Sequence, residues 1–230
     1  MNLFVPFFLI LFNLIFIPDN KTQLYYIHKA SSQKENAPLL ILLHGVGSNE
    51  QDLFSFADKI PSKYHVISLR APFVLAESSY GWYQVEFKNN KPFINVEQAE
   101  ASRLKLIHFL ETLKSEINYD PKQVYLCGFS QGAIMSYSVA LSRPDLVKGF
   151  VAMSGRMLDE HKPNFASKDK LKNLKVLITH GSADPVLNVE YAKQANVYLQ
   201  GLGLKPELKL YNEVHTINSG MLSDLLGWLD

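Results

Sequence analysis

The sequence predicts an α/β fold with a mostly parallel central sheet and helices on both faces. The first observation is that strand-like apolar segments alternate with segments of helical periodicity from Leu24 onward. The second is that several strand segments, such as PLLILLHG (38–45), are continuous apolar runs, which is typical of strands buried on both faces. The third is the length of 230 residues with 47% hydrophobic and 20% charged residues, which suits one globular domain.

Each expected element follows from its local pattern. Short apolar or β-branched stretches predict strands at 24–27 (an edge strand), 38–45, 64–72, 123–128, 147–155, 174–181 and 207–212. Helical spacing predicts helices at 96–117, 131–141, 189–203 and 217–229. On the first helix, one apolar side is expected from Ala99, Leu104, Ile107, Leu110 and Leu113. Two segments interrupt the alternation, 73–95 and 156–173. No repeat or linker divides the chain, so residues 21–230 are expected to form one catalytic domain.

Charge and cysteine content exclude several classes. The formal net charge is +1 and no block of Lys and Arg stands out, so no nucleic-acid partner is predicted. Cys127 is the single cysteine, which rules out an intramolecular disulfide and a cysteine-based zinc site. It is expected to be a small buried hydrophobic residue. These features fit a reducing compartment, and we predict a cytoplasmic domain.

Residues 1–20 are expected to be separate from that domain. Residues 3–18 are apolar, interrupted only by Pro6 and Asn13, and they lack the basic start and the cleavage site of a signal peptide. The run is slightly short for a spanning helix, which needs about 20 residues. Three interpretations stay open: association with a membrane, packing on the domain, or residues upstream of the true start. If the run inserts, the lysines that follow it favour a cytoplasmic domain.

The stretch YLCGFSQGAIMSYS (125–138) places Ser130 between Gly128 and Gly132. A strand pattern leads into this G-x-S-x-G motif and a helix pattern leads out. That context is typical of a sharp strand-to-helix turn that exposes a nucleophilic serine, where small neighbours avoid collisions. We therefore expect Ser130 Oγ to stand at the carboxyl edge of the sheet.

A serine nucleophile needs a base and an orienting carboxylate. In this fold class they follow the serine in the order acid and then histidine, each in a loop after a strand. Asp184 comes directly after 174–181, and His215 directly after 207–212. His180 is the alternative base, although it precedes the acid. Alternative acids are Asp145 and Asp159, which also fit helix-cap or loop roles.

Acyl transfer also needs two N–H groups directed at the developing oxyanion. Gln131 follows the nucleophile at a helix start and is expected to supply one. The glycine turn His44-Gly45-Val46-Gly47 follows an earlier strand, and the Val46 N–H is expected to supply the other.

The substrate side has weaker signals. Tyr80, Trp82 and Tyr83 lie in the aromatic segment that would overhang the serine, where they either line an acyl pocket or pack a hairpin on the domain. Arg156 and Met157 follow the strand pattern 147–155 and should reach the same sheet edge. Arg156 either contacts a polar or anionic leaving group or is a solvated loop residue.

Together, LLILLHGVGSNEQDL, YLCGFSQGAIMSYSVAL, THGSADPV and VHTI resemble the phospholipase/carboxylesterase branch of the α/β-hydrolase superfamily, which includes the acyl-protein thioesterases. The similarity extends from about Leu24 to the end of the sequence. It implies an α/β-hydrolase fold, a triad of Ser130, Asp184 and His215, and an oxyanion hole of the Val46 and Gln131 amides. One departure is Val214, where the family usually has glycine; a β-branched residue disfavours positive φ.

The sequence thus predicts a serine carboxylesterase that hydrolyses short-to-medium acyl esters through an acyl-enzyme, without a cofactor or metal. Its partner would be a small-molecule or lipid ester. Within enzymes, an acyl-protein thioesterase, a lysophospholipase or a peptidase stays open, because the triad does not name the bond cleaved. A non-catalytic binding protein of the same fold is the alternative of a different class, and Val214 is its only support. The sequence gives no indication of oligomeric state.

Overall fold

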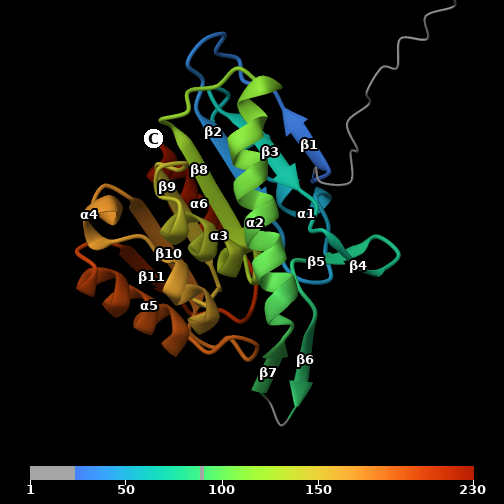
Figure 1. The fold of residues 1–230 in the computed structure, drawn as a ribbon, viewed down its shortest axis with the longest axis vertical. Helices are drawn as coiled ribbons and strands as arrows, with labels where there is room; N and C mark the ends of the chain where they lie inside the picture. Colours follow the sequence, from blue (N-terminus) through green and yellow to red (C-terminus); the bar gives the residue numbers. More distant parts are fainter. Residues whose placement is uncertain (1–23, 89–90) are drawn as a thin grey trace, which may run out of the picture.

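A computed structural model describes residues 24–88 and 91–230, and its centre is a seven-stranded sheet (Figure 1). The strands lie in the order β1-β3-β2-β8-β9-β10-β11. Their bounds are β1 Tyr26–Lys29, β2 Leu39–Leu43, β3 His65–Leu69, β8 Val124–Phe129, β9 Gly149–Met153, β10 Lys175–Gly181 and β11 Glu207–Tyr211. Six of these strands pair in parallel, and β1 runs antiparallel to β3 at one edge.

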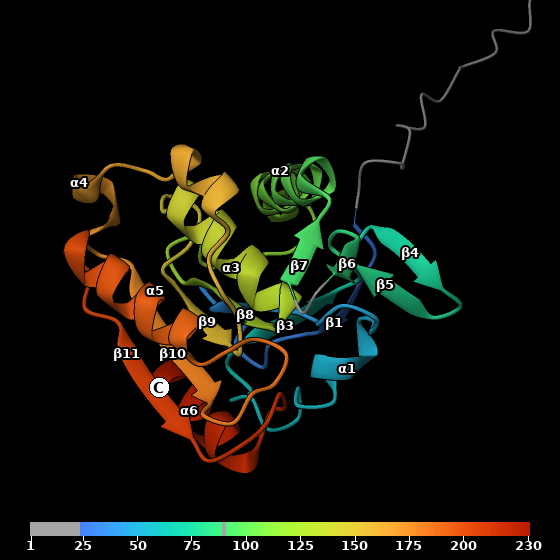
Figure 2. The ribbon, with the colours of Figure 1, turned by 90° about the horizontal axis from the view of Figure 1, so that it is seen from below.

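Helices cover both faces of the sheet (Figure 2). On one face lie α2 Val96–Thr112, α3 Gln131–Ser142 and α5 Glu190–Gly201, and on the other α1 Gln51–Phe54 and α6 Ser219–Leu229. The short helix α4 is Lys168–Leu171. In β2, Leu39, Ile41 and Leu43 join the core under α2, α3 and α5, whereas Leu40 and Leu42 join the core under α1 and α6. Because successive strand side chains alternate between faces, a strand covered on both faces is apolar throughout.

The expected elements are confirmed, with small shifts at their ends. The first strand begins at Tyr26, and α2 ends at Thr112, where a 3-10 turn over Leu113–Ser115 follows. The predicted apolar side of α2 was wrong in one residue, because Leu104 is 51% exposed. Leu104 lies about 140° around the helix from Ala99, whereas Leu106 and Leu110 lie close to the buried stripe. Cys127 is buried as expected, and burial raises the pKa of its thiol to about 12.

The aromatic segment 73–95 forms two hairpins. β4 Phe73–Ala76 pairs with β5 Ser79–Gly81, and β6 Val85–Lys88 pairs with β7 Lys91–Ile94. Both hairpins extend beyond the main sheet (Figure 1). The segment 156–173 contains a 3-10 helix, Asp159–Asn164, and then α4.

The predicted apolar segment 3–18 lies outside the described residues. Within 24–88 and 91–230, no helix has the length and apolar character needed to cross a membrane.

Candidate active site

Ser130 lies at the turn between β8 and α3 with a backbone conformation rare for a residue with a side chain, φ 52° and ψ −116°. Such a conformation costs on the order of 1–3 kcal/mol and persists only where the surroundings hold it. Here the Ser130 N–H donates to Met153 O of β9 at 2.9 Å, and Ser130 O accepts from Ile134 N at 3.0 Å. The turn is therefore tied both to the neighbouring strand and to the helix that follows.

The two glycines of the motif are positions of close backbone approach. A Cβ atom on Gly128 would lie 2.2 Å from Gly132 O, and one on Gly132 would lie 1.9 Å from Leu43 O. Both distances are far below van der Waals contact. The expectation that a side chain at either position would collide is confirmed, and the reason is that β2, β8 and α3 meet at this turn.

Three predicted side chains from three loops meet at the carboxyl edge of the sheet. His215 Nε2 lies 2.9 Å from Ser130 Oγ, and His215 Nδ1 lies 2.6 Å from Asp184 Oδ2. Both contacts are satisfied when Nδ1–H donates to the carboxylate and Nε2 accepts the serine hydroxyl proton. The Phe129 ring packs on the imidazole, with ring centroids 4.9 Å apart.

The Asp184 carboxylate is buried and hydrogen-bonded on both oxygens. Oδ1 accepts the N–H groups of Val186 and Leu187, each at 2.8 Å, while Oδ2 faces His215. The Asp-Pro pair that starts this turn is a local signal for such side-chain-to-backbone bonds, although the sequence analysis did not use it.

His180, the alternative base, is fully buried beneath this loop. Its Nε2 lies 2.7 Å from Leu187 O and 3.3 Å from Asp184 Oδ2. Burial lowers the pKa of His180 despite the nearby carboxylate. The imidazole therefore supports the acid loop, and the side chain within reach of Ser130 is His215.

The loop that carries His215 forms without positive φ at Val214. Among the described residues, the non-glycine residues with positive φ are Asn36, Ser78, Ser130 and Ser154. Close approach occurs instead at Gly181, where a Cβ atom would lie 2.4 Å from the carbonyl oxygens of both Glu213 and Val214. A glycine at the end of β10, which the sequence analysis overlooked, lets this loop reach the serine.

The glycine turn after β2 lies directly against the β8–α3 turn at Ser130, which we call the elbow. A Cβ atom on Gly45 would lie 3.4 Å from Ser130 Cβ. Gly47 has φ 83°, and its N–H donates to Tyr80 O at 2.8 Å, which ties the turn to β5. Among the described residues, no acceptor pairs with the N–H of Val46 or of Gln131. Neither amide is therefore engaged with an acceptor in the described part of the chain.

Buried hydrogen bonds of His44 and Trp82 hold the glycine turn in place. His44 Nδ1–H donates to Gly45 O at 2.7 Å, and His44 Nε2 accepts the Ala71 N–H at 3.0 Å. Burial lowers the pKa of His44, which favours the neutral ring that this pattern requires. The fully buried indole of Trp82 donates from Nε1 to His44 O at 2.9 Å.

The Gln131 side chain connects the elbow to the aromatic segment. Its Oε1 accepts the Trp82 N–H at 2.6 Å, and its Nε2 donates to Tyr83 O at 2.7 Å. These bonds hold the chain between the two hairpins across the start of α3. Sequence reasoning assigned a role only to the Gln131 backbone.

A cavity of about 50 Å³ opens beside Ser130, and its walls are mainly apolar. The lining residues are Val46, Tyr83, Val85, Pro92, Ile94, Ser130, Gln131, Ile134, Arg156, Val186 and Leu187. Of the predicted substrate-binding residues, this list includes Tyr83 and Arg156.

The other three predicted substrate-binding residues lie elsewhere. Trp82 does not line the cavity; it is fully buried and its indole donates to His44 O. The Tyr80 ring packs on Arg70, whose guanidinium carbon is 4.6 Å from the ring centroid. Met157 lines a second, larger cavity that it shares with Arg156.

The doubly covered sheet, the strained serine between two glycines and the loops that carry Asp184 and His215 are those of an α/β-hydrolase fold. The model of the family described as Phospholipase/Carboxylesterase matches residues 27–230. The chain belongs to this family, a hydrolase family that includes esterases and thioesterases.

Individual relatives agree with this assignment. An acyl-protein thioesterase 1 of Debaryomyces hansenii is 27% identical, over 89% of this chain and 95% of its own. A protein of Oryza sativa described as a probable inactive carboxylesterase is 21% identical, over 87% of each chain. Among solved structures, the esterase PE8 superposes with a TM-score of 0.77 at 26% identity, over 90% of this chain and 98% of its own.

Proposed function

We propose that this protein is a serine carboxylesterase that hydrolyses short-to-medium acyl esters through Ser130, His215 and Asp184. The observation that carries the proposal is the continuous hydrogen-bonded path from Ser130 Oγ through His215 to Asp184, with steps of 2.9 and 2.6 Å. A serine hydroxyl is a weak nucleophile alone, and an oriented imidazole within hydrogen-bond reach activates it.

In the proposed reaction, Ser130 Oγ attacks the ester carbonyl while His215 Nε2 takes its proton. Asp184 holds the imidazole in the required orientation and stabilises the imidazolium. The same proton then passes to the leaving oxygen, which departs as the alcohol and leaves an acyl-enzyme. Water, deprotonated by His215, attacks the acyl carbonyl and releases the carboxylic acid and free Ser130.

The oxyanion that forms in both steps would be bound by the Val46 and Gln131 amides. Support comes from the lack of another acceptor for either N–H among the described residues, and from the position of Gln131 at the start of α3, where the helix dipole favours negative charge.

Thioester hydrolysis is the second candidate, because the same chemistry cleaves both bonds and the D. hansenii relative is described as an acyl-protein thioesterase. A lysophospholipase would also use this machinery. We favour short-to-medium acyl groups over long ones, because the cavity beside Ser130 has a volume of only about 50 Å³.

The test is a substrate panel: p-nitrophenyl esters from acetate to palmitate, a matched acyl thioester and a lysophospholipid. Ser130→Ala, His215→Ala and Asp184→Asn should each lower kcat for p-nitrophenyl butyrate by about 10³–10⁶-fold, and combinations should cost little more because the three groups act as a unit. A fluorophosphonate should label wild-type Ser130 and fail to label Ser130→Ala.

His180→Asn serves as the matched control, since it changes the other histidine near Asp184. Loss of activity in His180→Asn with retention in His215→Ala would reject the proposed base. A folded wild-type protein that turns over no substrate and takes no label would instead favour the non-catalytic alternative, in line with the description of the rice relative.

A further inference from the structure

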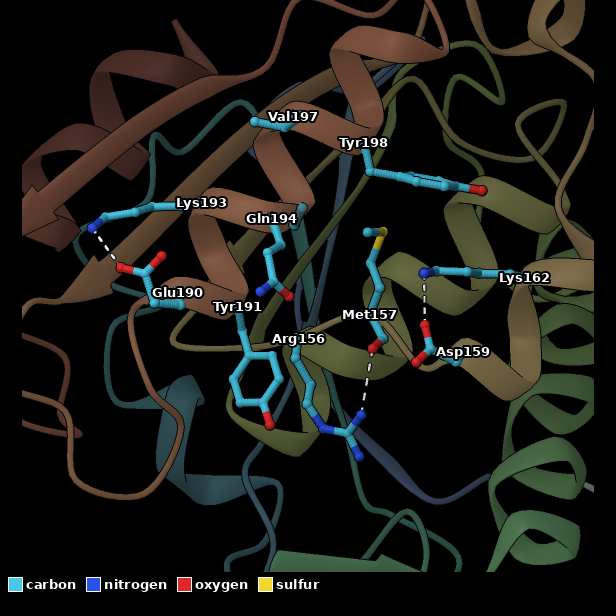
Figure 3. Close-up of a pocket in the computed structure, with 11 residues that line it drawn as sticks. Arg156, Met157, Asp159, Lys162, Glu190, Tyr191, Lys193, Gln194, Val197 and Tyr198 are labelled. Carbon is cyan, nitrogen blue, oxygen red and sulfur yellow. Dashed lines mark hydrogen bonds and ion pairs between the residues drawn. The ribbon is translucent and has the colours of Figure 1, made fainter.

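The larger of the two cavities near Arg156 has a volume of about 530 Å³ and lies between the segment after β9 and helix α5 (Figure 3). Its walls combine aromatic, aliphatic and charged side chains. Arg156 lines both this groove and the small cavity beside Ser130. An ester bound at Ser130 with one end in the small cavity and the other in the groove would therefore pass Arg156.

Two of the three cations that line the groove are already paired. Lys162 Nζ lies 2.6 Å from Asp159 Oδ1, and Lys193 Nζ lies 2.6 Å from Glu190 Oε1. Figure 3 shows both pairs on the walls, each with its dashed contact.

Arg156, the third cation, has no ion-pair partner in the described part of the chain. Its contact to Met157 O is long, at 3.5 Å, and its guanidinium carbon lies 5.8 Å from the Tyr191 ring centroid. A guanidinium presents five N–H donors in a planar fork that matches a carboxylate or a phosphate. These donors are thus available to a ligand.

The backbone fixes Arg156 beside the proposed nucleophile. The Ser154 N–H donates to Thr179 O at 2.8 Å, and Ser154 has φ 49°. A Cβ atom on Gly155 would lie 2.5 Å from Ala133 Cβ, so this segment touches the first turn of α3. The partial positive charge at that helix start adds to the charge of Arg156.

We propose that the groove is the leaving-group subsite and that Arg156 selects esters whose alcohol carries an anionic oxygen group, a carboxylate or a phosphate. The proposal rests on the proposed esterase function and names its substrate class. The apolar cavity would hold the acyl group, while the wider groove, whose walls include charged side chains, would hold the charged alcohol until it departs.

The experiment compares butyrate esters by acid release at constant pH. One pair is the butyrate ester of 3-hydroxypropanoate and that of its uncharged amide. The other is the butyrate ester of glycerol 3-phosphate and that of glycerol. The measured quantity is the ratio of kcat/KM for the charged ester to kcat/KM for its uncharged partner, which is independent of the fraction of folded enzyme.

In the wild type we expect a ratio above one for at least one pair, and that pair identifies the anion. Arg156→Gln should lower this ratio by about tenfold or more, the loss expected when a charge-assisted hydrogen bond is removed. Arg156→Lys, which keeps the charge without the planar fork, should lower it less. Lys148→Gln removes an exposed cation just before β9, at the far end of that strand, and should leave the ratio unchanged.

A ratio that Arg156→Gln leaves unchanged overturns the proposal, as does a wild type that prefers both uncharged esters. Either outcome would leave the esterase function intact, because the uncharged esters are still cleaved. Failure to cleave any ester would count against the esterase function itself.

Discussion

Gly132 illustrates how a single residue decides whether the elbow can form. It lies inside helix α3, where glycine normally costs stability, yet a Cβ atom there would stand 1.9 Å from Leu43 O. Gly227 also lies inside a helix, α6, but it is exposed and has nothing within 4 Å of the same ideal atom. Both glycines lie within helices, but a side chain at Gly132 would collide with backbone atoms, whereas one at Gly227 would meet nothing.

These surroundings lead to opposite expectations for alanine. Gly132→Ala should lower the free energy of unfolding by about 3 kcal/mol or more, because β2 and α3 must separate. Gly227→Ala should raise it by about 0.5–1 kcal/mol, because alanine loses less backbone entropy in a helix. Urea denaturation measures both. Equal stability of the two variants would mean that the elbow adapts to a side chain.

At the scale of elements, the β6–β7 hairpin supplies one wall of the cavity beside Ser130 through Val85, Pro92 and Ile94. The sequence offered Trp82 of the aromatic segment as one candidate to line an acyl pocket. Its indole instead donates to His44 O and does not line the cavity, so the β6–β7 hairpin is the element expected to limit acyl length.

The profile of kcat/KM against acyl length should have its maximum between acetate and octanoate. Ile94→Ala should move the maximum toward longer chains by about two to three carbons, each worth up to about 0.8 kcal/mol while it fits. Val74→Ala, on the exposed part of the β4–β5 hairpin, is the matched control and should keep the wild-type profile.

Trp82→Ala tests the alternative that Trp82, and not the β6–β7 hairpin, limits acyl length. We expect it to lower the free energy of unfolding by about 3–5 kcal/mol, the usual cost of truncating a buried aromatic residue. A shift in acyl preference in Trp82→Ala, with none in Ile94→Ala, would return the role to Trp82.

At the scale of the whole molecule, buried neutral histidines link stability to pH. Burial lowers the pKa of His44, His161 and His180. Below about pH 6.5 the unfolded chain therefore binds more protons than the folded one. Above that pH these histidines are neutral in both states and do not reduce the free energy of unfolding. Stability is lost as pH falls toward their folded pKa values.

The free energy of unfolding should therefore decrease between pH 7.5 and 5.5. Each such histidine can contribute a slope of up to about 1.4 kcal/mol per pH unit. His161→Gln should flatten the slope, because His161 is buried against Ser138 with Glu100 and Arg103 nearby. His108→Gln, an exposed change on α2, should keep it. Urea titrations at three pH values give the slopes, and parallel slopes in all proteins would contradict this account.

The extent of the catalytic domain is a second molecular-scale prediction. The family match begins at residue 27 and β1 begins at Tyr26, so we propose that residues 21–230 suffice for catalysis. A variant lacking residues 1–20 should hydrolyse p-nitrophenyl butyrate within a few-fold of the full chain. If residues 3–18 associate with a membrane, the deletion should also move the protein from the membrane fraction to the supernatant. A truncated chain that no longer folds would show that the segment belongs to the core.

The order of the elements and the three proposed catalytic residues could be predicted from sequence because each has a local signal. A continuous apolar run predicts a doubly covered strand, and G-x-S-x-G between a strand and a helix predicts an elbow. Asp184 and His215 were found by their place after strands, and the structure brings both to Ser130. The prediction that Leu104 belongs to the buried side of α2 was wrong, because its angle around the helix, and not its apolar character, decides which side it faces.

The sequence by itself therefore determined the fold class, the family and the three side chains that we propose as catalytic, since these depend on patterns within one segment or on the order of segments. Only the tertiary structure decided the substrate side: that Trp82 packs under the His44 turn, that the Gln131 side chain holds the aromatic segment, and that Arg156 lines two cavities without an ion-pair partner among the described residues. These roles depend on contacts between segments far apart in the chain, and no local pattern encodes which side chains line a cavity and which do not.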